Sequence, residues 1–216
     1  MSMQVIYGGT FDPIHHGHLR LAVELRDRLG VDQIRLVPSY VPPHRDAPGA
    51  SPDQRLRLLE LAIAGEPGLM LDDREVRREG ASYTADTLAQ LREVIGPDEP
   101  LAMVVGTDAF AGFDRWRDWQ RIPELAHIVV VERPGEPLDP AGIPAGLLAE
   151  RGVRSPAELH NTPAGRLLSL APPLLDISAT GIRERIAAGR SPRYLFPDAV
   201  WDEIRRLELY GYSARR

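Results

Sequence analysis

The chain has 216 residues, of which 43% are hydrophobic, so it is long enough to form one compact domain with a substantial apolar core. Its 31 acidic and 26 basic residues give a formal net charge of −5, which argues against a nucleic-acid-binding protein but allows a local basic pocket for a small anion. Cysteine is absent, which excludes disulfides, cysteine-bound metals and thiol nucleophiles and favours a cytoplasmic location, and no stretch approaches the roughly 20 apolar residues of a membrane-spanning helix.

Short apolar runs alternate with stretches of helical spacing along the chain. Residues 3–7 form an apolar run that stops at Gly8 and Gly9, which predicts a buried strand entering a tight turn. A helical stripe follows Pro13 and is closed by Gly30. Further apolar runs predict strands at 34–37, 69–71, 101–105, 126–131 and 167–170. Apolar residues at helical spacing predict further helices at 51–64 (with Leu56, Leu59, Ile63 and Ala64), 82–95, 110–119 (with Phe110, Phe113, Trp116 and Trp119), 180–188 and 198–209.

This alternation predicts the fold class. Strands and helices at this spacing form βαβ units, so we expect an α/β domain with a doubly wound, Rossmann-like parallel sheet and helices on both faces. The whole chain, 1–216, is expected to be one domain, with a surface insert at about 135–165 and a C-terminal helical part at about 178–210. In such folds the ligand binds beyond the carboxyl ends of the strands, so the loops that follow the strands are the candidate sites.

The loop after the first strand combines features of an anion site. Gly8 and Gly9 let backbone N–H groups approach a ligand, and the following helix N-terminus favours negative charge. His15 and His18 are three residues apart and share a helix face, from which two imidazoles donate hydrogen bonds to oxyanions. An ordinary helix cap, a surface histidine and a histidine-bound metal are the alternatives. The loop matches neither of the common nucleotide-binding fingerprints with a GK[ST] or GxGxxG pattern.

A second candidate lies late in the chain, where a strand leads into a helix. Ser178 and Thr180 are good N-cap residues, and Arg183 follows one turn into the helix. A guanidinium that folds back over that helix N-terminus brings five donors beside the two hydroxyls, which suits a polyphosphate. An ordinary capped helix with a solvated arginine is the alternative.

Taken together, these two motifs resemble a known superfamily. Residues 9–18 are similar to the T/HxGH signature of the nucleotidyltransferases, and residues 177–183 to their ISxTxxR motif, about 160 residues later. Within that superfamily the chain resembles the bacterial nicotinate mononucleotide adenylyltransferases. Nearly the whole chain except about 135–165 takes part, through the further segments 38–45, 82–88, 106–108 with Trp116 and Trp119, 133–134 and 194–197.

The resemblance implies transfer of AMP from ATP to nicotinate mononucleotide by direct in-line attack, with release of pyrophosphate. It implies His15, His18 and Arg183 as catalytic residues, with His18 as the main donor to the transition state. Mg²⁺ would be carried by the ATP phosphates, and no protein metal ligand is expected. The resemblance implies that ATP contacts Gly8, Gly9, Thr10, Phe11, His15, His18, Gly106, Asp108, Ser178, Thr180 and Arg183.

The resemblance also implies an acceptor site. Trp116 would stack on the pyridine ring and Thr84 would donate to the nicotinate carboxylate, while His44 and Arg45 would lie near the acceptor phosphate. Arg117 would favour the acid over the amide if its side chain points inward. The acceptor site therefore comprises Thr10, His44, Arg45, Thr84, Trp116 and Arg117.

Three other functions fit parts of the sequence. An adenylyltransferase acting on phosphopantetheine shares the two phosphate motifs but is not expected to have Thr84 and Trp116 in these contexts. An enzyme acting on nicotinamide mononucleotide differs only in the group recognised on the ring. A non-catalytic nucleotide-binding module is allowed by the fold, but it has no need of His15, His18 and Arg183 together.

Overall fold

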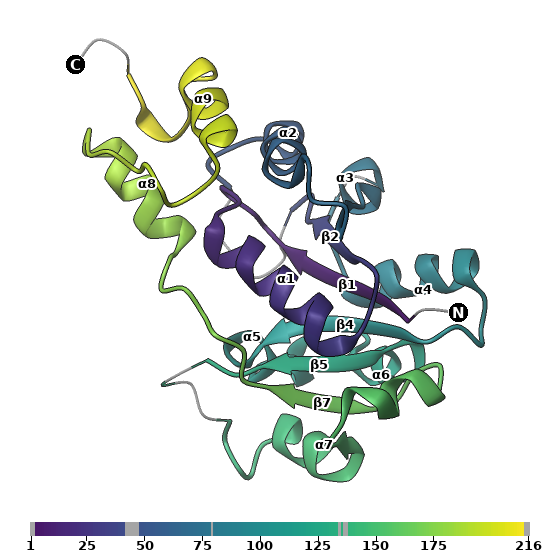
Figure 1. Ribbon diagram of the computed structural model, residues 1–216. Coiled ribbons are helices and arrows are strands. Elements are labelled where there is room, and N and C mark those ends of the chain that lie inside the picture. The colour runs from purple at the N-terminus through teal and green to yellow at the C-terminus, as the bar shows by residue number, and fades with distance from the viewer. Residues whose placement is uncertain (1–2, 42–47, 79, 134, 136–137, 214–216) are drawn as a thin grey trace.

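The computed structural model describes residues 3–41, 48–78, 80–133, 135 and 138–213. Within them, seven parallel strands form one sheet in the order β3-β2-β1-β4-β5-β7-β6 (Figure 1). The strands are β1 (Gln4–Gly9), β2 (Ile34–Pro38), β3 (Leu69–Leu71), β4 (Leu101–Gly106), β5 (His127–Val131), β6 (Gly152–Val153) and β7 (Leu167–Leu170). The predicted doubly wound parallel sheet is confirmed.

Local signals explain where the longer helices begin and end. Gly30 ends the first helix in the left-handed region, at φ 64°, and its N–H bonds to the carbonyl of Arg26. Ser51 and Gln54 form a capping box at the start of the second helix. The helices are α1 (His16–Leu29), α2 (Pro52–Ile63), α3 (Arg74–Arg78), α4 (Thr84–Ile95), α5 (Thr107–Phe110), α6 (Ile122–Leu125), α7 (Ile143–Arg151), α8 (Ala179–Ala187) and α9 (Asp198–Arg206). None of these helices is long and apolar enough to cross a membrane.

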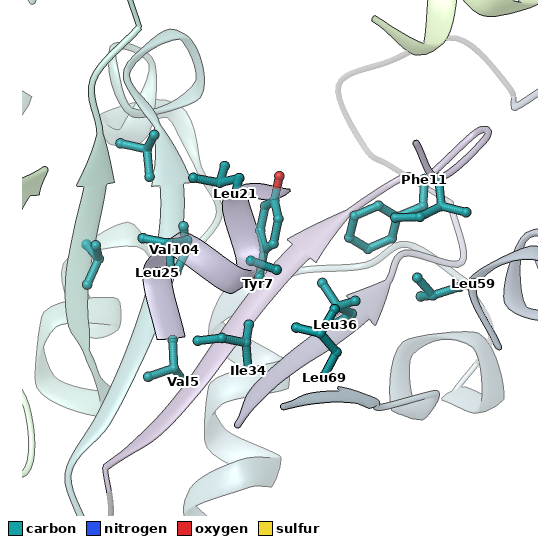
Figure 2. Packing of buried hydrophobic residues seen from close by; sticks show 14 of the residues in the cluster. Val5, Tyr7, Phe11, Leu21, Leu25, Ile34, Leu36, Leu59, Leu69 and Val104 are labelled. Carbon is teal, nitrogen blue, oxygen red and sulfur yellow. The ribbon is translucent and has the colours of Figure 1, made fainter. Parts of the chain in front are cut away.

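Alternation along the strands sends side chains into two apolar layers. Val5 and Tyr7 of β1 pack on one face with Leu25 of α1, as Figure 2 shows, whereas Ile6 packs on the other face with Leu88 of α4. The sheet is therefore covered on both faces, and the central strands are mostly apolar, as in other parallel sheets.

Several sequence expectations need correction. The predicted helix at 110–119 does not form, because α5 ends at Phe110, Trp116 has an extended backbone at ψ 144° and Asp118 a left-handed one at φ 52°, and two 3₁₀ turns take its place. Leu59 of the expected stripe is buried on α2 and Ile63 packs against the core, but Arg55 and Leu58 complete the buried face where the expectation had neither. The short helix α3 was not predicted. The expected surface insert at about 135–165 contains α7 and also β6, which extends the sheet beside β7.

The strand order places the candidate site. The chain winds outward from β1 to β3, returns to β4 on the other side of β1, and so reverses direction between these two strands. Loops from the carboxyl ends of β1 and β4 flank this point, which is where ligands bind in open parallel sheets. In Figure 1 the C-terminal helices α8 and α9 lie at the same end of the sheet, near the start of α1, and α9 packs against α2.

Candidate active site

The loop after β1 is shaped by a close contact between a glycine and a phenylalanine. Phe11 is buried and has a left-handed backbone at φ 50°. Its ring lies against Gly9, where a Cβ atom would stand only 2.8 Å from the ring. Any other residue at position 9 would push this ring away, so Gly9 is required for the loop to turn here.

The two motif histidines lie face to face. The rings of His15 and His18 stack with their centroids 3.7 Å apart, and the ring of Phe11 meets His18 edge-on at 5.1 Å. His15 is only 4% exposed, and burial, reinforced by His16 and Arg133, lowers its pKa from 6.5 to about 4. His15 is therefore neutral at neutral pH, when one of its ring nitrogens carries a proton and the other accepts.

Gly17 joins the two motifs that lie about 160 residues apart. A Cβ atom on Gly17 would come within 3.0 Å of the His15 ring and 3.4 Å of the carbonyl oxygen of Ile177. The glycine therefore allows the His15 ring to fold back and lets the segment before α8 pass close to the start of α1. The predicted meeting of the HxGH and ISxTxxR segments is a feature of the fold.

At the start of α8 the hydroxyls and the arginine come together. Ser178 caps the helix by accepting a hydrogen bond from the N–H of Gly181 at 3.1 Å. Thr180 accepts from Nη2 of Arg183 at 3.3 Å, and Nη1 of Arg183 donates to the backbone carbonyl of Asp12 at 2.7 Å. The guanidinium thus folds back toward the start of α8 and also reaches the loop after β1.

Asp12 is the buried anion of this region. Its carboxylate accepts from the backbone N–H groups of Gly49 at 2.7 Å and Ala50 at 3.2 Å, and from the hydroxyl of Tyr210 at 2.8 Å. Arg183 adds an ion pair at 3.7 Å. A carboxylate with both oxygens occupied in this way is a structural anchor between the loop after β1, the loop before α2 and the C-terminal segment.

Arg55 is the buried cation beneath the same loops. Its side chain is fully buried and donates to three backbone carbonyls, those of Thr10 and Tyr40 at 2.8 Å and that of Ala50 at 3.3 Å. Desolvation lowers the pKa of Arg55, while the carboxylate of Asp12 opposes this change. Arg55 holds the loops after β1 and β2 at fixed positions beside the site.

At the carboxyl ends of β4 and β5, hydrogen bonds connect the loops that follow the two strands. Thr107 donates to the carbonyl of Val131 at 3.1 Å and accepts from the N–H of Arg133 at 2.8 Å, which ties the two loops together. Nη1 of Arg133 donates to Asp108 at 3.3 Å. A Cβ atom on Gly106 would lie 2.5 Å from the Asp108 carboxylate, so the glycine leaves room for this pair.

The predicted acceptor residues come from two further segments. Trp116 packs on Phe113 with ring centroids 5.5 Å apart, and Thr84 begins α4. Arg117 connects these segments, because its guanidinium lies 4.6 Å from the centre of the Tyr83 ring and 3.9 Å from Asp86. Thr84 therefore lies, in sequence, between Tyr83 and Asp86, two residues that Arg117 contacts. The charge of Arg117 is engaged by α4 and by its neighbour Asp118.

Two predicted acceptor residues, His44 and Arg45, lie outside the described residues. The residues just before them are fixed to the start of α4. The N–H of Tyr40 donates to the Ser82 hydroxyl at 2.9 Å, and Val41 accepts from the N–H of Ser82 at 3.1 Å.

The described residues contain no cluster of three or more histidine, aspartate or glutamate side chains arranged to bind a metal. The carboxylates nearest the motifs are already engaged, Asp12 by its four donors and Asp108 by Arg133. The imidazoles, hydroxyls and guanidinium of the two motifs suit the phosphates of a nucleotide. They fit a divalent cation that arrives with those phosphates and keeps few protein ligands.

The surface of the described residues carries two open grooves of similar size. One of about 400 Å³ lies beside the start of α8, where Ser178, Gly181 and Arg185 contribute to its walls. The other, of about 460 Å³, lies between residues 95–100 and 160–163, next to the amino end of β4 and away from the motifs. Because ligands of open parallel sheets bind at the carboxyl ends, the larger groove is not the candidate site.

Sequence reasoning missed three of the residues that shape the site. Asp12 stood inside the recognised motif but was given no role, and Arg55 and Tyr210 were not selected. Arg55 does carry a detectable signal, because it shares a helix face with Leu58 and Leu59, where a charged residue is unexpected. Tyr210 carries no such signal, since its partner Asp12 is 198 residues away.

Comparisons with known proteins agree with this geometry. A family model described as cytidylyltransferase-like matches residues 6–185. A Marinobacter nauticus protein named "Probable nicotinate-nucleotide adenylyltransferase" is 67% identical over 97% of this chain and 97% of its own length. A Cellvibrio japonicus protein of the same name is 51% identical over 95% of this chain and 97% of its own length.

A solved structure supports the same fold. The Plasmodium falciparum nicotinic acid mononucleotide adenylyltransferase complexed with NaAD superposes with a TM-score of 0.74 over 99% of both chains, at 17% identity. With its HxGH turn, its ISxTxxR helix and these relatives, the chain belongs to the cytidylyltransferase-like family and, within it, to the nicotinate-nucleotide adenylyltransferases.

Proposed function

We propose that this protein transfers the adenylyl group of ATP to nicotinate mononucleotide, which gives deamido-NAD and pyrophosphate. The observation that carries the proposal is the meeting of the stacked pair His15 and His18 with the α8 residues around Arg183, at the point where the strand order reverses. The name shared by the close relatives supports the same substrates.

The reaction needs no covalent intermediate on the protein. A phosphate oxygen of the mononucleotide attacks the α-phosphorus of ATP, a new P–O bond forms, and the bond to the bridging oxygen breaks with its electron pair leaving on pyrophosphate. Such a displacement depends on positioning and on stabilising charge as it develops. Mg²⁺ bound to the ATP phosphates would neutralise part of that charge.

We assign the phosphate contacts to the residues that the fold gathers around the loop after β1. His18 donates to the reacting phosphoryl group, and the neutral ring of His15 stacks behind it. Ser178, Thr180 and Arg183 receive the β- and γ-phosphates that leave. Gly8, Gly9, Thr10 and Phe11 line the loop, and Gly106 and Asp108 lie at the nucleoside side of the site.

We assign the acceptor to the face between α4 and the segment after α5. Trp116 stacks on the pyridine ring and Thr84 donates to the carboxylate, while His44 and Arg45 stay predictions for the acceptor phosphate. Because Arg117 contacts Tyr83 and Asp86, we place it at the rim of this site, beside the start of α4. The cytoplasmic location expected from the lack of cysteine also stays a prediction.

The test is pyrophosphate release with ATP and Mg²⁺, run in parallel with nicotinate mononucleotide, nicotinamide mononucleotide and phosphopantetheine. We expect the acid to be strongly preferred. Equal use of acid and amide would leave the enzyme class but remove the assigned specificity. Preference for phosphopantetheine, or ATP binding without turnover of any acceptor, would refute the proposed function.

Two variants test the assigned residues in the same assay. His18→Ala should lower kcat by about 10²–10³-fold with a much smaller change in the KM for ATP, because its hydrogen bond strengthens as charge develops. Trp116→Ala should instead raise the KM for the acceptor and leave the KM for ATP nearly unchanged. A pure KM effect of His18→Ala would make His18 a ground-state binding residue.

A further inference from the structure

The C-terminal segment reaches directly into the phosphate loop. Tyr210 lies in a 3₁₀ turn (Leu209–Gly211), and its hydroxyl donates to Oδ1 of Asp12 at 2.8 Å. The ring of Tyr210 lies against Gly49, where a Cβ atom would stand 3.2 Å from it. The same glycine donates its N–H to Oδ2 of Asp12 at 2.7 Å. Tyr210 and Gly49 therefore fit together around the one carboxylate.

The carboxylate is fixed by donors from two distant segments of the chain. Asp12 is 5% exposed, and its donors come from the C-terminal segment, from Gly49 and from the N–H of Ala50 at 3.2 Å. Burial and the neighbouring carboxylate raise the pKa of Tyr210 above its ordinary value, so the hydroxyl keeps its proton and remains a donor. Hydrogen bonds to an ionised acceptor are about twice as strong as neutral ones.

Asp12 in turn fixes Arg183. Nη1 of Arg183 donates to the backbone oxygen of Asp12 at 2.7 Å and lies 3.7 Å from Oδ2 of its carboxylate. Nη2 lies 3.3 Å from the Thr180 hydroxyl. The Arg183 side chain is 34% exposed, so without Asp12 it would have many rotamers available, and holding it in one orientation costs conformational entropy.

We propose that the Tyr210 hydroxyl is a positioning group, which acts through Asp12 to hold the guanidinium of Arg183 beside Thr180 in the orientation that receives a polyphosphate. This inference rests on the proposed function, since it takes Arg183 as a ligand of the ATP phosphates. It makes the end of the chain a working part of the site. Tyr210 touches no substrate in this scheme and contributes only by pre-organising Arg183.

A double-mutant cycle tests this coupling. Tyr210→Phe removes one hydroxyl and should lower kcat/KM for ATP by about tenfold, the kinetic equivalent of one hydrogen bond to a charged group. In an Arg183→Ala background, where there is no guanidinium to position, the same change should lower it by less than about twofold. A general structural role predicts the same loss in both backgrounds, and that result would overturn the proposal, as would no loss in the native background.

A matched control comes from the same segment. Tyr212 lies two residues further on and packs edge-on against Trp201 at 5.3 Å, so Tyr212→Phe removes an equivalent hydroxyl away from Asp12. Its kcat/KM should equal that of the native protein. Thermal unfolding of every variant checks that the fold is retained.

A binding assay separates this inference from the proposed function. The cycle is repeated by calorimetry with Mg²⁺ and a non-hydrolysable ATP analogue, without an acceptor. If no acceptor is turned over, the proposed function fails, whereas coupling between Tyr210 and Arg183 in the Kd still supports the positioning role. Additive effects on the Kd would refute it.

Discussion

Replacing the buried Arg55 by lysine should destabilise the protein strongly although the charge is kept. The guanidinium donates to the carbonyls of Thr10, in the loop after β1, and of Tyr40 and Ala50, in the connection between β2 and α2. An ammonium group is a compact donor on a flexible stem, and it cannot copy the planar fork that reaches all three. Arg55→Lys therefore leaves two of these carbonyls without their partner.

The magnitude follows from the burial of these groups. Leaving one buried acceptor unpaired costs about 1–3 kcal/mol, and water can partly hydrate the two carbonyls that lose their donor. We therefore expect the free energy of unfolding to decrease by about 2–4 kcal/mol. For a domain of this size the unfolding temperature falls by about 2–4 °C per kcal/mol. The expected decrease is therefore about 5–15 °C. Because the carbonyls of Thr10 and Tyr40 lie in the loops that shape the site, kcat/KM should also decrease, even at temperatures at which the variant is still folded.

Urea and thermal unfolding of the two lysine variants of α2 provide the assay. Arg57 is on the same helix, is 53% exposed and pairs with Glu60 at 3.1 Å. Arg57→Lys should change the free energy of unfolding by less than about 0.5 kcal/mol. If Arg55→Lys is as mild as Arg57→Lys, the three backbone hydrogen bonds do not hold the loops and the reasoning is wrong.

Two further predictions concern His15 and Arg117. The pKa of His15 is about 4 in the folded protein and 6.5 when unfolded, so its contribution to stability is complete above pH 6.5 and is lost as the pH falls toward 4. When the pH is lowered from 7.5 to 5, the free energy of unfolding, measured with urea, should decrease by about 2 kcal/mol less in His15→Asn than in the native protein. An equal decrease in both proteins would contradict the lowered pKa of His15. Arg117→Ala should change the ratio of kcat/KM for acid and amide acceptors by less than about threefold, because its charge is engaged by Asp86 and Asp118 at an exposed position. A larger loss of acid preference would show that Arg117 faces the nicotinate carboxylate.

The order and boundaries of most elements follow from the sequence alone. Gly30 and the pair Ser51 and Gln54 act on their own helix ends, so local chemistry places those ends correctly. The alternation of apolar runs with helical stripes was enough to predict the parallel sheet, and the two motifs beyond the strands were enough to choose the candidate site residues. These signals are local or periodic, and they do not depend on which distant segment becomes the neighbour.

Only the tertiary structure shows how the site is held together. The predicted 110–119 helix is interrupted by the extended backbone at Trp116 and the left-handed backbone at Asp118, which helical spacing cannot reveal. The same is true of Arg55 beneath two loops and of the Tyr210 hydroxyl on Asp12, 198 residues away. A buried charge or hydroxyl is stabilised only by partners that the completed fold brings to it. The sequence therefore determined which residues are the candidates for the site, and the packing of distant segments decided what holds them in place.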